Sequence, residues 1–150
     1  MSTIAPVAKD EAARLAALEE LLILDTAKEP VFVAIAALAA AICETAIALI
    51  SRVDRHRQWF KARVGLDVRE TPREVAFCAH AILNPEMMEV PDAASDPRFG
   101  DNPLVLDESP YAELRPYNRC DVARGNDQRR WPCQRGRPSL LVPFRIHPGP

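Results

Sequence analysis

Apolar residues recur along the first hundred positions with helical and strand periods in turn. From Asp10 to Leu24 the leucines follow a helical spacing, which predicts an amphipathic helix with Asp10 as its N-cap. Its apolar stripe comprises Leu15, Leu18, Leu21 and Leu22. The sequence from Thr26 to Glu29 has the S/T-x-x-E form of a capping box and predicts a second helix that runs to about Cys43. Because this helix is apolar nearly all round, we expect it to lie between a sheet and another element.

Two apolar runs on either side of a polar turn predict a β-hairpin. The runs are Ala46–Val53 and Gln58–Val64, and the residues at 54–57 between them are polar. Helices that alternate with a hairpin in this way predict a mixed α/β (α+β) fold.

A third helix is expected after the hairpin. Thr71-Pro72-Arg73-Glu74 combines a capping threonine, proline at the first helical position and glutamate at the third, and Asn84-Pro85 would end the helix. A short strand at 87–90 and one helical turn after Asp96-Pro97 complete the expected elements.

Composition places a boundary near Leu106. Residues 1–106 carry 11 basic against 16 acidic side chains, whereas 107–150 carry 8, all arginine, against 5. The later segment also holds 7 of the 14 prolines and shows no sustained helical or strand period. We therefore expect a disordered N-terminus at 1–9, one α/β domain at 10–106, and an irregular Arg/Pro-rich tail at 107–150.

Several classes of protein are disfavoured. Val31–Ile50 has the length of a membrane span, but the carboxylate of Glu44 deep in a bilayer would cost roughly 2.5–3.5 kcal/mol, so a buried helix and strand is the better interpretation. The net charge of −2 gives no general attraction to nucleic acid. No secretory signal is visible, and the cysteines form no C-x-x-C pair, so we expect free thiols in the cytoplasm. The cysteines are Cys43, Cys78, Cys120 and Cys133.

Four blocks of sequence carry a family resemblance. They read LDTAKEPVF (24–32), IALISRVDRHRQWFKARVGLD (47–67), RETPREVAFCAHAIL (69–83) and VPDAASDPRFGDNPLV (90–105). In order, spacing and wording they strongly resemble the GAF domains at the N-terminus of bacterial sensor kinases and cyclic-di-nucleotide signalling proteins. The resemblance implies a central antiparallel sheet with helices on one face and a small-molecule pocket on the other. It also implies terminal helices that pack against a second copy, an attached output domain, and in most members no catalysis by the domain itself.

The chain departs from the family pattern. Val33, Ala46 and Arg52 replace an acidic residue, a proline and an apolar residue that are usual in the family. After Leu106 the family continues with two strands joined by a D-G hairpin, whereas this chain reads LRPYNRCDVARGNDQRRWPC. We therefore expect a GAF-like domain that is incomplete at its C-terminal end, and we hypothesise a frameshifted or degraded reading frame from about residue 107.

Six residues are candidates for ligand binding. Trp59 and Phe60 are adjacent in a strand and point to opposite faces, so one packs in the core and the other is free to line a pocket or a partner surface. Arg63 and Arg73 would anchor an anionic ligand near the expected helix start. Cys78 and His80 are about 200° apart around a helix, which is poor geometry for a catalytic pair. We expect Cys78 to be a small buried thiol and His80 to be a polar residue of a pocket or of the surface instead.

No cofactor or metal site is expected. Asp92, Asp96 and Asp101 fit the roles of turn and cap residues better than those of cation ligands. Cys120, Cys133 and His147 lack the short-range ligand pair of a zinc site.

These observations predict a sensory or regulatory module of bacterial signal transduction, of the two-component or cyclic-di-nucleotide kind, without its output domain and without enzymatic activity. It would bind an unidentified small molecule and form a homodimer through the N-terminal helix. Three alternatives stay open: a thiol-dependent reductase on a GAF fold, a ligand-free dimerisation module, and a fragment of a sensor histidine kinase or diguanylate cyclase. The chain contains no G-G-D-E-F loop and no nucleotide-binding glycine motif.

Overall fold

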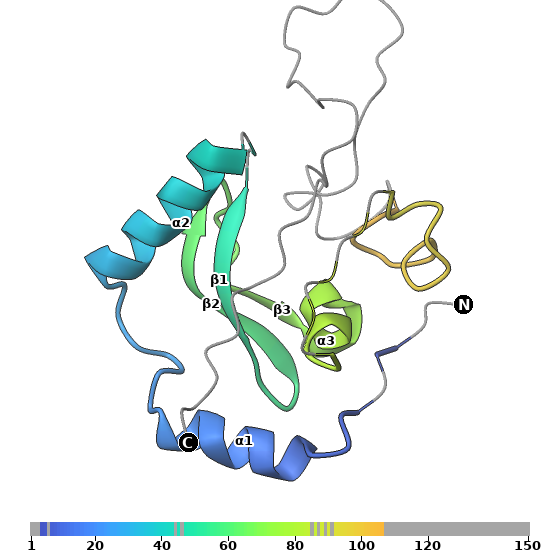
Figure 1. Ribbon diagram of the computed structural model, residues 1–150, viewed down its shortest axis with the longest axis horizontal. Coiled ribbons are helices and arrows are strands. Elements are labelled where there is room, and N and C mark those ends of the chain that lie inside the picture. The colour runs from blue at the N-terminus through green and yellow to red at the C-terminus, as the bar shows by residue number, and fades with distance from the viewer. Residues whose placement is uncertain are drawn as a thin grey trace, which may run out of the picture.

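Three antiparallel strands organise the fold in the computed structural model (Figure 1). β1 (Ala48–Val53) pairs with β2 (Arg57–Val64), and the other edge of β2 pairs with β3 (Glu70–Pro72). The structure describes residues 4–106 apart from 6, 44, 46, 85, 87, 89 and 91. Helices and an antiparallel sheet together confirm the predicted mixed α/β fold. The predicted tail at 107–150 lies outside the described residues.

The β1–β2 hairpin forms as predicted. Asp54 N donates to Arg57 O across the turn at 2.8 Å. The register shifts between Ile50 and Ser51, so that Ala62 and Phe60 have β1 partners while Lys61 between them has none. Such a bulge inserts one extra residue into a strand and bends it locally. The side chain of Lys61 is fully buried.

Helices lie on both faces of this sheet (Figure 1). α2 (Pro30–Cys43) packs against β1 and β2 on one face. On the other face lie α3 (Phe77–Ala81), the short 3-10 helix η1 (Arg73–Val75) and the turns of 92–106. α1 (Glu11–Glu20) runs past the turn end of the hairpin.

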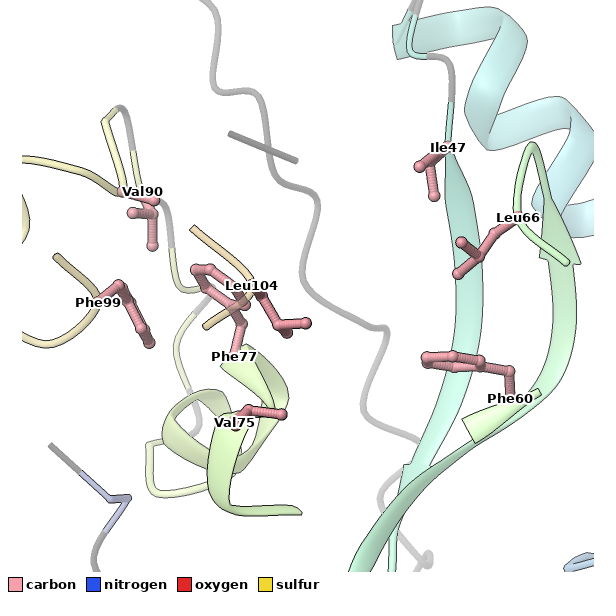
Figure 2. Close-up of a cluster of buried hydrophobic side chains, with 9 residues drawn as sticks. Ile47, Phe60, Leu66, Val75, Phe77, Val90, Phe99 and Leu104 are labelled. Carbon is pink, nitrogen blue, oxygen red and sulfur yellow. The ribbon is translucent and has the colours of Figure 1, made fainter. Parts of the chain in front are cut away.

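The main hydrophobic core fills the space between the sheet and the α3 layer. Figure 2 shows side chains from the hairpin and the turn after it facing side chains from η1, α3 and 90–104. The core comprises Ile47, Phe60, Leu66, Val75, Phe77, Val90, Ala93, Phe99 and Leu104. A smaller cluster of Val53, Ala76 and Ala79 has Ala5 packed against it, so part of the segment predicted as disordered at 1–9 contacts the domain.

The predicted capping box at Thr26 is wrong. α2 begins at Pro30, and the backbone carbonyl of Glu29 accepts from Phe32 N at 3.1 Å and Val33 N at 3.2 Å. Thr26 Oγ1 accepts instead from Lys61 Nζ at 2.7 Å, and Glu29 Oε1 pairs with the same ammonium. The two side chains that would cap a helix therefore bind a buried lysine on β2.

The predicted third helix is also shorter than expected. Thr71 and Pro72 belong to β3, where Thr71 pairs with Gln58, and regular α-helix begins only at Phe77. Thr71 is buried, and among the described residues its Oγ1 has no hydrogen-bond partner, so it caps no helix there. Strand pairing with β2 takes precedence over the local helix-start signal.

The first helix follows the prediction in part. It ends at Glu20, and positive φ angles at Leu22 (48°) and Asp25 (58°) turn the chain away. Leu15 and Leu18 are buried as the stripe requires, whereas Leu21 and Leu22 are 65% and 82% exposed. Asp10 occupies the N-cap position but makes no capping hydrogen bond with its side chain.

The composition of the second helix predicts burial between two layers, and this prediction is wrong. Only Ala36 is fully buried in α2. Four large apolar side chains on its outer face are more than half exposed: Val31, Ile35, Leu38 and Ile42. Within the part of the chain that is described, no helix is long and apolar enough to cross a membrane.

The later turns agree with their predicted roles where they are described. Asp92 Oδ1 accepts from Ala94 N at 3.0 Å, and Asp96 O accepts from Phe99 N and Gly100 N at 2.9 Å, which forms the expected single turn. Of the predicted strand at 87–90, residues 87 and 89 lie outside the described residues. Met88 and Val90 are not in a strand.

We expect the Lys61–Glu29 pair to be measurably coupled. Glu29→Gln leaves a buried ammonium with only neutral acceptors, which should lower the free energy of unfolding by about 1–3 kcal/mol. In a Lys61→Met background the same change should cost less than about 0.5 kcal/mol, because no buried charge remains. Urea unfolding of the four proteins measures the coupling. Glu20→Gln, at an exposed position, is the control. Equal losses in both backgrounds would show that the pair does not stabilise the fold.

Candidate functional site

The two aromatic candidates are both core residues. Trp59 is 7% exposed and Phe60 is 5% exposed. Phe60 belongs to the main core between the sheet and α3 (Figure 2). Trp59, its neighbour in β2, points to the other face, as strand geometry requires. Neither ring lines the cavity at the turn of the hairpin.

Arg63 closes the turn after β2. Its Nε donates to the carbonyl of Leu66 at 3.0 Å, and the side chain is half-buried. This hydrogen bond spans three residues and stabilises the loop that leads to β3. The structure thus gives Arg63 a local partner, and its predicted contact with a ligand stays a prediction.

Cys78 lies in a polar contact between α3 and the hairpin. Its Sγ accepts from Gln58 Nε2 at 3.0 Å and contacts Ser51 Oγ at 3.6 Å. Burial raises the pKa of the Cys78 thiol above its usual value, and the two hydrogen bonds offset this only in part. The thiolate that a nucleophilic cysteine needs is therefore disfavoured at neutral pH.

His80 packs inside the α3 layer rather than into an open pocket. It is 9% exposed, and its ring meets Phe99 edge-on with 4.9 Å between the ring centroids. Phe99 in turn packs against Phe77 at 4.3 Å. His80 and Cys78 also have different neighbours, in agreement with their predicted separation around the helix.

Among the six candidates, Arg73 lines a cavity at the turn of the hairpin. This cavity has a volume of about 430 Å³, within the range of small-molecule sites. Three segments far apart in the sequence form it: the N-terminal segment with the start of α1, the turn of the hairpin, and the junction of β3 with η1. Its lining residues are Ile4, Ala5, Val7, Glu11, Leu15, Arg55, His56, Pro72, Arg73 and Glu74.

A partly buried ion-pair network forms one wall of the cavity. Glu11 Oε1 accepts from Arg73 Nη1 at 2.5 Å and from Arg14 Nη2 at 2.7 Å, and Arg14 Nε donates to Glu11 Oε2 at 3.0 Å. The hydrogen bonds from Arg14 and then Arg73 lower the pKa of Glu11 from 4.5 to about 2, against an opposing effect of burial. Arg14 Nη1 also donates to Val53 O at 2.6 Å. The network therefore attaches α1 to both the hairpin and η1.

Two basic side chains of the lining are uncommitted. Arg55 and His56 occupy the turn of the hairpin, and both are exposed. Within the described part of the chain, neither side chain has a hydrogen-bond or ion-pair partner. Arg73 uses Nη1 for Glu11 and for Asp54 O at 3.2 Å, while its buried Nη2 has no hydrogen-bond partner among the described residues.

Sequence reasoning missed most of this site. Glu11 and Arg73 are 62 positions apart, and the turn residues Arg55 and His56 look like ordinary solvent-facing charges. Only the excess of basic residues in an otherwise short hairpin turn is a local signal, and it is weak. The described residues contain no group of three or more His, Cys, Asp or Glu side chains placed to hold a metal ion.

Comparison with known proteins relates the chain to part of a longer protein. No family model matches the chain. Over 103 residues the chain is 48% identical to a cyclic di-GMP phosphodiesterase of Pseudomonas aeruginosa. The matched segment is 69% of this chain but only 18% of that protein. The chain is thus similar to one part of a considerably longer protein.

Acidification should test the Glu11 network. Because the folded-state pKa of Glu11 lies below the unfolded value, its stabilisation is complete above about pH 4.5 and is lost as the pH falls toward 2. Glu11→Gln should lower the free energy of unfolding at pH 6 by up to about 3 kcal/mol. This difference from the unmodified chain should shrink steadily between pH 5 and pH 3 in urea titrations.

The matched control for this experiment is Glu19→Gln, which alters an exposed carboxylate on the same helix. It should change the free energy of unfolding little at any pH. A Glu11→Gln deficit that is the same at pH 6 and pH 3 would contradict the ion-pair explanation.

Proposed function

We propose that this chain carries most of a GAF-type sensory or regulatory module of a cyclic di-GMP signalling protein. The observation that supports the proposal most directly is the 48% identity over 103 residues to part of a cyclic di-GMP phosphodiesterase. The sequence blocks between 24 and 105 that resemble GAF domains supply the second support.

A regulatory role fits the extent of the match better than a catalytic one. The similar segment is 18% of the relative, so most of that protein lies elsewhere. The ionisable candidates of this chain are engaged in structural contacts: Cys78 with Gln58, and Arg63 with Leu66 O. In this proposal the chain binds a small molecule and transmits the effect of binding to an attached region of the protein.

The alternative of a thiol-dependent reductase receives little support from the environment of Cys78. Its thiol is buried, its pKa is raised, and Ser51 and Gln58 are its polar neighbours. A reactive cysteine instead needs an accessible position with a lowered pKa. The assignment as a fragment of a sensor histidine kinase or diguanylate cyclase concerns the attached region and stays a prediction.

A ligand screen and a hydrolysis assay on the 150-residue chain test the proposal. The screen measures thermal unfolding in the presence of cyclic nucleotides, amino acids and aromatic or aliphatic acids. At least one of these compound classes should raise the midpoint temperature of unfolding by several degrees. Cyclic di-GMP incubated with the chain alone should remain intact, because the proposed role is regulatory. No stabilising compound, or hydrolysis by the chain itself, would overturn the proposal.

A ligand-free dimerisation module is the second candidate, and the outer face of α2 favours it. Val31, Ile35, Leu38 and Ile42 repeat at intervals of four, three and four residues. These intervals match the d, a, d and a positions of a coiled coil. Isoleucine at a with leucine at d favours a dimer of two parallel helices. No residue of α2 is charged, so the side chains of two copies of this helix have no like charges to bring together.

The size of this stripe limits the strength of such a dimer. A helix of 14 residues is about 21 Å long, so a seam along it buries much less than the roughly 800 Å² per partner of a stable interface. The association should therefore be weak and concentration-dependent. A homodimer through α1 has less apolar surface to use, since Leu15 and Leu18 are already buried within the chain.

Sedimentation equilibrium of the 150-residue chain tests the α2 pairing. Leu38→Gln removes one apolar side chain from each partner and should raise the dimer dissociation constant at least tenfold. Ala37→Gln is the matched control, because Ala37 is exposed but lies about 130° around the helix from the stripe. A monomer at all concentrations, or equal effects of both substitutions, would contradict a dimer through α2.

A further inference from the structure

We propose that the cavity at the turn of the hairpin binds a small organic acid, with its carboxylate at Arg55, His56 and Arg73 and its apolar body against the N-terminal segment. The inference rests on the proposed small-molecule function and specifies both the place and the chemical class of the ligand. It concerns a different place from the core between the sheet and α3, to which Phe60 belongs.

The cavity has two chemically distinct sides. Ile4, Ala5, Val7 and Leu15 form an apolar side, and they come from the N-terminal segment and α1. The basic side is formed by the hairpin turn and by Arg73 from η1. A ligand that fills such a site combines an apolar body with one polar group, as is usual for small-molecule pockets.

The balance of charge favours one negative group on the ligand. Glu11 is held between Arg14 and Arg73, so its single negative charge faces two positive charges. Arg55 and His56 add basic groups that are not paired within the described residues, and Glu74 at the rim is exposed. A monoanion would complete this arrangement, because a guanidinium pairs with a carboxylate through two parallel hydrogen bonds.

A doubly charged phosphate fits less well. Both Glu11 and Glu74 belong to the lining, and each would repel a second negative charge. Half of the lining is apolar and offers a phosphate no hydrogen-bond donors. The cavity volume of about 430 Å³ leaves room for a short aliphatic or single-ring acid.

The exposed apolar residues of the N-terminal segment support an apolar ligand body. Ile4 is 65% exposed and Val7 is 68% exposed, although both line the cavity. Ala5 between them packs against the small cluster of Val53, Ala76 and Ala79. A ligand body placed under Ile4 and Val7 would cover surface that is otherwise in contact with water.

This position also gives the ligand a route to α1. The start of α1 is attached to η1 through Glu11–Arg73 and to β1 through Arg14 and Val53 O. A carboxylate that contacts Arg73 acts on the same guanidinium, and an apolar body contacts Leu15. Binding would therefore stabilise the packing of α1 on the hairpin. This change in the packing of α1 is how the site would transmit the presence of the ligand.

Binding of phenylacetate and hexanoate to the 150-residue chain tests the proposal. Isothermal titration should detect both acids, and their neutral amides, phenylacetamide and hexanamide, should bind at least tenfold more weakly. The Arg55→Gln/His56→Gln double variant should weaken binding of the acids at least fivefold and leave the amides unchanged. Both substituted side chains are exposed, so the variant should unfold at the same urea concentration as the unmodified chain.

Arg69→Gln, which removes an exposed arginine outside the cavity lining, is the matched control and should leave binding of the acids unchanged. In amide NMR spectra the acids should shift His56, Arg73 and Glu11 more than Phe60 or Phe77. Failure of both acids to bind, or equal binding by the double variant, overturns the proposal. If another compound class stabilises the chain while the acids do not bind, this inference fails and the proposed function stands. If no compound of any class binds, both fail.

Discussion

The buried ammonium of Lys61 connects the sheet with the loop that leads into α2, and the placement of this helix depends on it. The bulge in β2 leaves Lys61 without a partner in β1, and its side chain is buried toward the loop between the first two helices. Thr26 Oγ1, Ala27 O and Glu29 Oε1 accept its three protons, and the ring of Phe32 lies 5.3 Å away. A buried ammonium is costly without such acceptors, so the loop has little freedom to take another course.

The start and the orientation of α2 follow from this constraint. Glu29 is held by Lys61 through its side chain, and its carbonyl accepts the first backbone bonds of the helix. α2 therefore begins at Pro30 and lies along the hairpin with Ala36 against the sheet. A helix with apolar residues all round and only one covering layer must expose the rest, which is why Leu38 and its neighbours face outward. Composition alone suggests burial on both sides because it does not show how many layers are present.

The sequence predicts the elements whose contacts are local and fails where distant contacts take precedence. The hairpin is correct because its turn and alternation lie within twenty residues. The two capping boxes are wrong because each threonine has a partner outside the motif. Thr26 binds Lys61, 35 positions away, and Thr71 pairs with Gln58 in the sheet. In each case the threonine has a partner or a position that the local motif does not contain. A capping motif therefore contains information only about the next three residues, and contacts with the sheet can prevent the helix start that it predicts.

Arg73 shows how a candidate residue can line a cavity for a reason that the sequence does not contain. Its prediction as an anion anchor rested on a helix start at Thr71, yet no α-helix starts there. Arg73 reaches the cavity because β3 places η1 beside the turn of the hairpin, where the backbone N–H of Arg73 donates to His56 O at 3.0 Å. That single backbone bond aligns the Arg73 side chain with Glu11 and with the basic turn. The cavity is thus a product of strand pairing, and no motif within one segment could have indicated its shape.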